Sequence, residues 1–148
     1  MTLSSSRCAA NVAFVLRAAV AGAFIVAAVL KLRDATAFAE QIANYQLLPE
    51  LSNYLAVALP GVELIAASAL LLTKAEWRWA AGLVLLGLLV VFTTAIGRAW
   101  FVGINLECGC FGVGSTHIGP WPIVRNLCLS AALLGAWCLE RSSPAADR

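Results

Sequence analysis

Charged residues are scarce in this sequence. Asp, Glu, Lys and Arg together make up 12% of the 148 residues, against about a quarter in a typical soluble domain. Hydrophobic residues make up 61%. So much apolar surface cannot be hidden inside one domain of this length, and we therefore expect the chain to lie in a lipid bilayer.

The sequence also lacks the motifs of several common ligands. The formal net charge is +2, and there is no basic run or recognisable nucleic-acid module, which argues against nucleic-acid binding. There is no Gly-rich phosphate loop after a strand and no Cys-x-x-Cys-His motif, so nothing indicates a nucleotide, flavin or haem site.

Four continuous apolar segments are long enough to cross a membrane, which takes about 20 residues each. They run over approximately residues 12–32, 54–73, 79–102 and 121–139. Their apolar residues do not alternate with polar ones, which excludes a β-barrel pattern. The first segment is longer than the core of a signal peptide and ends in a poor cleavage site, so we expect it to be retained. The predicted fold is all-α: a four-transmembrane-helix bundle forming a single membrane domain over residues 1–148.

A shorter helix is predicted between the first two spans. Asp34 is a plausible N-cap, Phe38, Ile42 and Tyr45 recur at helical spacing, and Pro49 would stop the helix. A short amphipathic helix lying at the membrane interface fits this pattern.

The distribution of Lys and Arg predicts the topology. The N-terminal region, the second loop and the C-terminal region carry more of these residues than the first and third loops, and positive charge favours the cytoplasmic side. We expect a multi-pass protein of the cell (inner or plasma) membrane with both termini in the cytoplasm. The third loop would then lie outside the cytoplasm, where disulfides persist.

That third loop carries the strongest local signal, Cys108-Gly109-Cys110. A disulfide between cysteines one residue apart closes a small strained ring, which is easily reduced and so suits thiol–disulfide exchange. Two alternatives stay open. Cys108, Cys110 and His117 could bind a soft metal such as copper or zinc, or the two cysteines could be ordinary thiols or pair elsewhere.

Charged residues inside the predicted spans are the second signal, because they are costly in a membrane and often functional. Glu63 lies near the middle of the second span, and Arg98 and Arg125 are placed so that long side chains could converge on it. Arg125 and Cys128 are three residues apart and share a helix face, so the guanidinium could activate the thiol or hold a quinone head group. A purely structural ion pair remains an equal alternative.

The order and spacing of these pieces resemble the MauE/DoxX-like redox-associated membrane proteins, most closely the MauE type of methylamine utilisation. The resemblance covers roughly residues 12–139 and rests on five segments: Lys31-Leu32-Arg33-Asp34, Tyr45-Gln46-Leu47-Leu48-Pro49, Pro60-Gly61-Val62-Glu63-Leu64, Cys108-Gly109-Cys110-Phe111-Gly112 and Arg125-Asn126.

The resemblance implies a four-helix membrane bundle that forms, reduces or relays disulfides, usually with a thioredoxin-like partner outside the cytoplasm. It implies that Cys108 and Cys110 are the exchanging pair, and it assigns supporting positions to Glu63, Arg125 and Asn126. Relatives in the broader group are linked to quinone-coupled redox complexes, so a quinone is a possible cofactor.

Three functions therefore remain in view. The first is a thiol–disulfide oxidoreductase, the second a soft-metal binding protein, and the third a non-catalytic assembly factor for a redox complex. The sequence leaves open the direction of electron flow, the identity of the partner and any participation of Cys8, Cys128 or Cys138.

Overall fold

The computed structural model describes residues 2–47, 49–103 and 119–142. The described part is entirely helical. Its elements, in chain order, are α1 (Thr2–Arg33), α2 (Ala35–Asn44), the short 3-10 helix η1 (Pro49–Leu51), α3 (Ser52–Leu72), α4 (Ala75–Phe101) and α5 (Pro120–Ser142). The predicted all-α class is confirmed.

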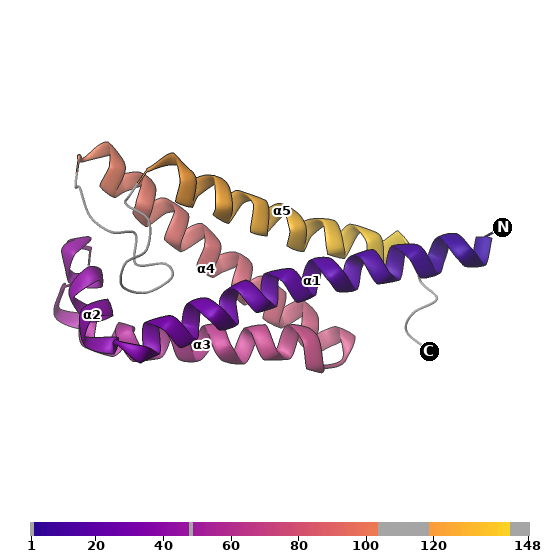
Figure 1. Ribbon diagram of the computed structural model, residues 1–148, viewed down its shortest axis with the longest axis horizontal. Coiled ribbons are helices and arrows are strands. Elements are labelled where there is room, and N and C mark those ends of the chain that lie inside the picture. Colours follow the sequence, from indigo (N-terminus) through magenta and orange to yellow (C-terminus); the bar gives the residue numbers. More distant parts are fainter. Residues whose placement is uncertain (1, 48, 104–118, 143–148) are drawn as a thin grey trace.

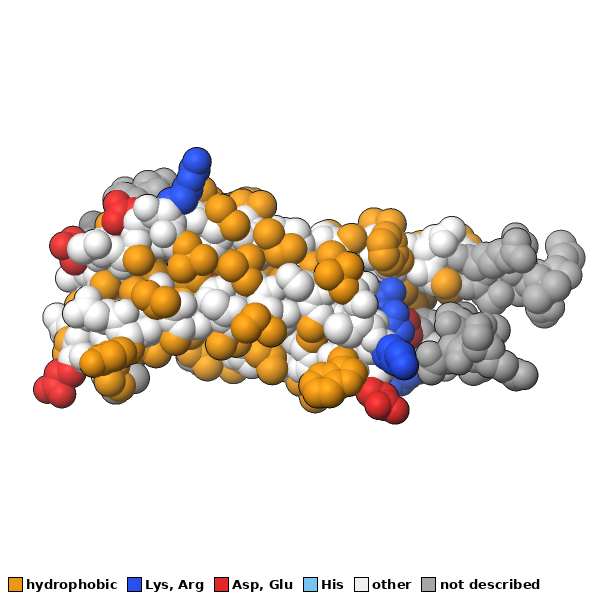
Figure 2. All heavy atoms as spheres, turned by 90° about the horizontal axis from the view of Figure 1, so that it is seen from below, with side chains coloured by type: hydrophobic (Ala, Val, Ile, Leu, Met, Phe, Trp, Pro, Cys, Tyr) orange, Lys and Arg blue, Asp and Glu red, His pale blue; other side chains and the backbone are white. Residues whose placement is uncertain are grey.

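Four of these helices are long and apolar enough to cross a membrane. Their candidate spans are Cys8–Arg33, Pro49–Leu72, Ala75–Phe101 and Pro120–Arg141. The surface agrees, since Figure 2 shows apolar side chains along the body of the molecule and charged side chains gathered toward its two ends. The chain is a multi-pass membrane protein with four candidate spans, and the bilayer is its solvent.

The four long helices form a ring. Helix α1 packs against α3 and α5, and α4 packs against the same two helices, so α1 and α4 lie diagonally opposite one another. Helix α1 begins and α5 ends at one end of the bundle, while α2, the end of α4 and the start of α5 lie at the other (Figure 1). We call these the terminal end and the α2 end.

Small residues allow the helices to approach one another closely. The core combines alanines with a few large side chains from all four long helices: Val20, Ala21 and Phe24, then Ala66, Ala67 and Leu70, then Ala81, Leu85 and Leu89, and finally Leu133 and Trp137. Apolar burial gives little driving force between helices in lipid, so dispersion contacts across such close interfaces hold the bundle together.

The predicted short helix between the first two spans is present as α2. The Asp34 carboxylate accepts a hydrogen bond from the Ala37 backbone N–H at 3.0 Å, which confirms Asp34 as the N-cap. The apolar face of α2 packs Phe38 and Ala39 against Ala56 of α3. The helix ends at Asn44, ahead of Pro49. Docked in this way, α2 covers the first half of α3.

Candidate functional site

The most deeply buried charges in the described part of the chain form an ion pair between α1 and α3. Lys31 Nζ lies 2.5 Å from Glu63 Oε1, and the two side chains are 1% and 0% exposed. Glu63 sits midway along α3, whereas Lys31 lies near the end of α1. Two charges this far from water are tolerated because each neutralises the other.

Aromatic rings complete the surroundings of the Lys31 ammonium. Nζ lies 5.3 Å from the ring centroid of Phe38 and 4.8 Å from that of Phe92, both within range for a cation–π attraction. Phe38 belongs to α2 and Phe92 to α4. One side chain of α1 therefore contacts residues of three other helices.

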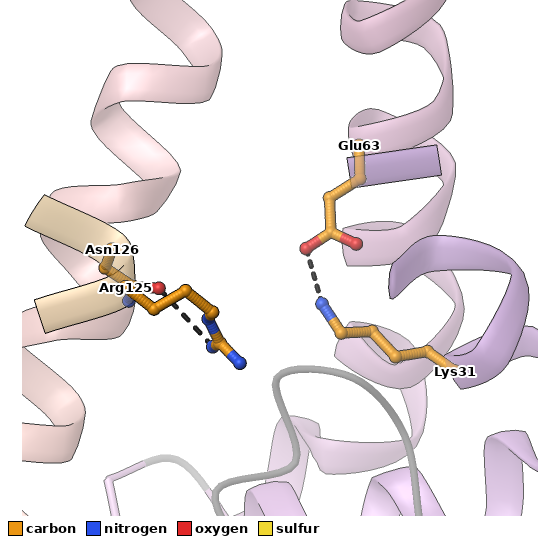
Figure 3. Close-up of polar contacts among 4 residues, drawn as sticks. All are labelled: Lys31, Glu63, Arg125 and Asn126. Atoms are coloured by element: carbon orange, nitrogen blue, oxygen red, sulfur yellow. Dashed lines mark hydrogen bonds and ion pairs between the residues drawn. The ribbon is translucent and has the colours of Figure 1, made fainter. Parts of the chain in front are cut away.

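A second polar group faces this pair from α5. Asn126, which is 3% exposed, donates from Nδ2 to Thr93 Oγ1 of α4 at 3.3 Å and accepts from Arg125 Nη2 at 3.4 Å. Thr93 in turn donates to the Leu89 carbonyl oxygen at 2.6 Å. Figure 3 shows the Arg125 guanidinium pointing across an opening toward Lys31 and Glu63. We call Lys31, Glu63, Arg125 and Asn126 the polar cluster.

A small cavity lies between the two halves of the polar cluster. All four of its residues line the cavity, together with apolar side chains that include Phe92. Its volume of about 20 Å³ is enough for one water molecule. Within the described residues Glu63 Oε2 is buried without a hydrogen-bond partner, and a bound water would supply one. Ligand pockets are usually about 300–1,000 Å³, so a quinone head group would need the helices to move apart.

Arg98 does not join the polar cluster. It is exposed near the end of α4, and its Nη1 donates to the Tyr45 carbonyl oxygen at 3.3 Å, which ties the end of α2 to α4. Burial raises the pKa of the Tyr45 hydroxyl to about 12, further above physiological pH than the usual value of about 10. Arg98 thus fastens the α2 end of the bundle.

None of the cysteines that the structure describes lines the cavity. Cys128 is exposed on α5 and is not among the residues that line the cavity. We expected Cys128 to share a helix face with Arg125, but its thiol does not reach the polar cluster. Cys8 and Cys138 are exposed as well. Cys108, Cys110 and His117 fall outside the described residues. Inside the described ranges no group of three His, Cys, Asp or Glu side chains could hold a metal.

Lys31, Phe92 and Thr93 are absent from the residues predicted for the site. A carboxylate in the middle of a span requires a cation, and Lys31 lies at the end of the first predicted span. That requirement indicates that a cation is nearby, but it does not distinguish Lys31 from the arginines of the other spans. No sequence pattern marks Phe92 or Thr93, because both lie in the charge-free stretch of α4 between Arg78 and Arg98.

Comparison with known proteins gives consistent matches. The family model described as methylamine utilisation protein MauE matches residues 9–139. The chain is 35% identical over 126 residues to the methylamine utilization protein MauE of Paracoccus denitrificans, and 33% identical over 130 residues to that of Paracoccus versutus. These alignments cover 83% and 84% of this chain and 67% of each relative. No solved structure matches the chain.

Proposed function

Since this chain belongs to the MauE family, with residues 9–139 matched by the family model, we propose that it exchanges disulfides at the extracytoplasmic face of the membrane through Cys108 and Cys110. Its partner would be a secreted or membrane-tethered thioredoxin-like protein. The names of the relatives suggest that the disulfides it handles belong to a protein of methylamine utilisation.

The observation that carries this proposal is the Cys108-Gly109-Cys110 sequence in the connection between α4 and α5. Helix α4 ends and α5 begins at the α2 end of the bundle (Figure 1). By the distribution of positive charge, this end would face away from the cytoplasm. A cysteine pair attached there would be accessible to a partner in a compartment that permits disulfides.

The proposed reaction is ordinary thiol–disulfide exchange. A thiolate of the partner attacks one sulfur of the Cys108–Cys110 disulfide, the other sulfur leaves as a thiolate, and a mixed disulfide forms. The second thiolate of the partner then attacks the mixed disulfide. The partner leaves oxidised, and Cys108 and Cys110 take up two electrons and finally two protons. The reverse sequence would deliver reducing equivalents to the partner.

The polar cluster supports such chemistry from within the membrane. Arg125 is the sixth residue of α5, counted from Pro120, and its cation would favour a nearby thiolate over a thiol. Glu63 and Lys31 are ionisable residues inside the membrane with space for one water beside them. Such residues often hold or transfer protons in membrane proteins. These are supporting roles, and the exchanging atoms are the two sulfurs.

The proposal predicts a measurable redox couple. Mass-tagging of thiols across a glutathione series, on membrane-embedded protein, should show Cys108 and Cys110 converting together between dithiol and disulfide. The midpoint should lie in the range of exchange catalysts, about −120 to −270 mV. Cys128→Ser is the matched control, since that thiol is exposed and does not line the cavity, and it should leave the midpoint unchanged.

Three outcomes would contradict the proposal. Thiols that stay reduced, or a disulfide that stays closed, across the whole series would exclude exchange. Stoichiometric copper or zinc, lost on Cys108→Ser, would instead establish a soft-metal protein, and loss on His117→Ala would add His117 as a ligand. Full function in a Cys108→Ser/Cys110→Ser variant would indicate an assembly factor without turnover. If exchange occurs, single Cys→Ser variants should accumulate a mixed disulfide with the partner.

A further inference from the structure

A second group of charges lies at the terminal end of the bundle, far from the polar cluster. Arg17 Nη1 of α1 forms an ion pair with Glu140 Oε1 of α5 at 2.6 Å, and the two side chains are 9% and 25% exposed. Arg78, in the first turns of α4, lies close enough to Arg17 to repel its charge. In the described part of the chain, Arg17 pairs with Glu140, whereas Arg78 forms no ion pair.

A third arginine joins this group through aromatic rings. The Arg141 guanidinium carbon lies 4.7 Å from the ring centroid of Trp79, and Trp79 stacks on Trp137 with centroids 4.5 Å apart. Arg141 is exposed, whereas Arg78 is half-buried. Figure 2 shows blue side chains, with red ones beside them, gathered near one end of the apolar body. We call Arg17, Arg78 and Arg141 the arginine group.

We infer that the arginine group binds the phosphate of an anionic phospholipid in the leaflet that surrounds the terminal end. The three cations come from α1, α4 and α5, and Glu140 pairs with only one of them, Arg17, so the arginine group and Glu140 together carry a net charge of +2. Within the described residues Arg78 Nε is buried without a hydrogen-bond partner. An added anion would remove the repulsion between Arg17 and Arg78.

The chemistry and the depth of the group both fit a lipid head group. Guanidinium groups bind phosphate oxygens with two parallel hydrogen bonds, which makes arginine the preferred phosphate ligand. Trp77, one residue before Arg78, is exposed, and tryptophans at the lipid surface concentrate at the level of the head groups. Basic sites between spanning helices bind anionic lipids in the same way. Exposed apolar residues below this level, such as Leu83 and Val84 of α4, would contact the acyl chains.

The test is lipid retention by the full chain. Purified protein in detergent should be offered equal amounts of phosphatidylglycerol and phosphatidylcholine, and bound lipid should be counted by native mass spectrometry. The unmodified chain should retain phosphatidylglycerol preferentially. Arg78→Gln should weaken that binding about fivefold, the usual effect of removing one cation at a membrane surface. Arg141→Gln, at an exposed position, should weaken it similarly with little risk to folding.

Arg98→Gln is the matched control, because it makes the same change on α4 at the opposite end of the bundle. It should leave phosphatidylglycerol retention unchanged. Equal retention of both lipids by the unmodified chain, or equal loss in the Arg98 and Arg78 variants, would overturn the inference. Competition by inorganic phosphate at millimolar concentration, with no preference for the lipid, would make this a site for free anions and would also overturn it.

Discussion

Replacing Glu63 by leucine should destabilise the protein by about 3–5 kcal/mol, because it leaves the Lys31 ammonium buried without its counter-charge. The pair is fully buried, and Phe38 and Phe92 attract the cation too weakly to replace a carboxylate. Thermal unfolding in detergent, followed by loss of the monodisperse peak in gel filtration, measures the effect. Arg98→Leu is the control, since Arg98 is exposed, and it should change the unfolding temperature much less.

The double variant Lys31→Met/Glu63→Leu should recover most of the lost stability. Two apolar side chains of similar volume require no desolvation of charge, and such replacements of a buried pair are often neutral or stabilising. A Glu63→Leu variant as stable as the unmodified chain would contradict this account of the pair. So would a double variant no more stable than the single one.

The same double variant separates a structural role of the pair from a functional one. If it folds and the Cys108–Cys110 pair still exchanges with its partner, the ion pair serves only to fix how α1 and α3 pack. If it folds and exchange is lost, the pair acts in the chemistry. The second result is expected under the proposed function, because Lys31 and Glu63 line the same cavity as Arg125 and Asn126.

The number and type of the helices could be predicted from the sequence because each span is a continuous apolar run of sufficient length. The capping of α2 could be predicted too, since the N-cap interaction of Asp34 depends on the next three residues alone. Both signals are local. The family followed from short segments in a fixed order, and the comparisons confirm it.

The partner of Glu63 was not predictable by such local rules. The sequence suggests arginines on later spans, whereas the structure pairs Glu63 with Lys31 of α1. Lys31 lies near the end of α1, yet it meets the middle of α3, because α2 turns back and packs against the first half of α3. That packing shifts α3 relative to α1 along the axis of the bundle. The size of this shift cannot be read from the spacing of residues in the sequence.

The position of Cys128 illustrates a related limit. Residues three apart on a helix are neighbours, but they differ by about 60° in direction around its axis. The cavity takes Arg125, Asn126 and Leu129 from α5, which centres it on the opposite side of Arg125 from Cys128. Which neighbour of Arg125 faces inward depends on the rotation of α5 against α1 and α4, and this rotation is set by packing in three dimensions.

Close packing at the terminal end leads to a second large effect. Gly82→Ala should destabilise the bundle by about 1–3 kcal/mol, although alanine is the better helix former by about 1 kcal/mol. A Cβ atom at Gly82 would lie 2.5 Å from Cζ2 of Trp137. The indole has little freedom to retreat, since it stacks on Trp79, and Arg141 covers the Trp79 ring. Thermal unfolding and tryptophan fluorescence should both report the change.

Gly87→Ala on the same helix is the matched control. A Cβ atom there meets nothing within 4 Å, so the gain in helix propensity should act alone and stability should stay constant or rise slightly. Opposite signs for the two substitutions would show that the contact with Trp137, and not glycine as such, matters at position 82. Equal effects would mean that the Trp79–Trp137 stack moves easily to make room for the added methyl group.

The rigidity of that stack also bears on the arginine group beside it. If the stack moves easily, the arginine group is held less rigidly than its contacts suggest, and Gly82→Ala should leave phosphatidylglycerol retention intact. If the stack is rigid, the same substitution should lower that retention together with stability.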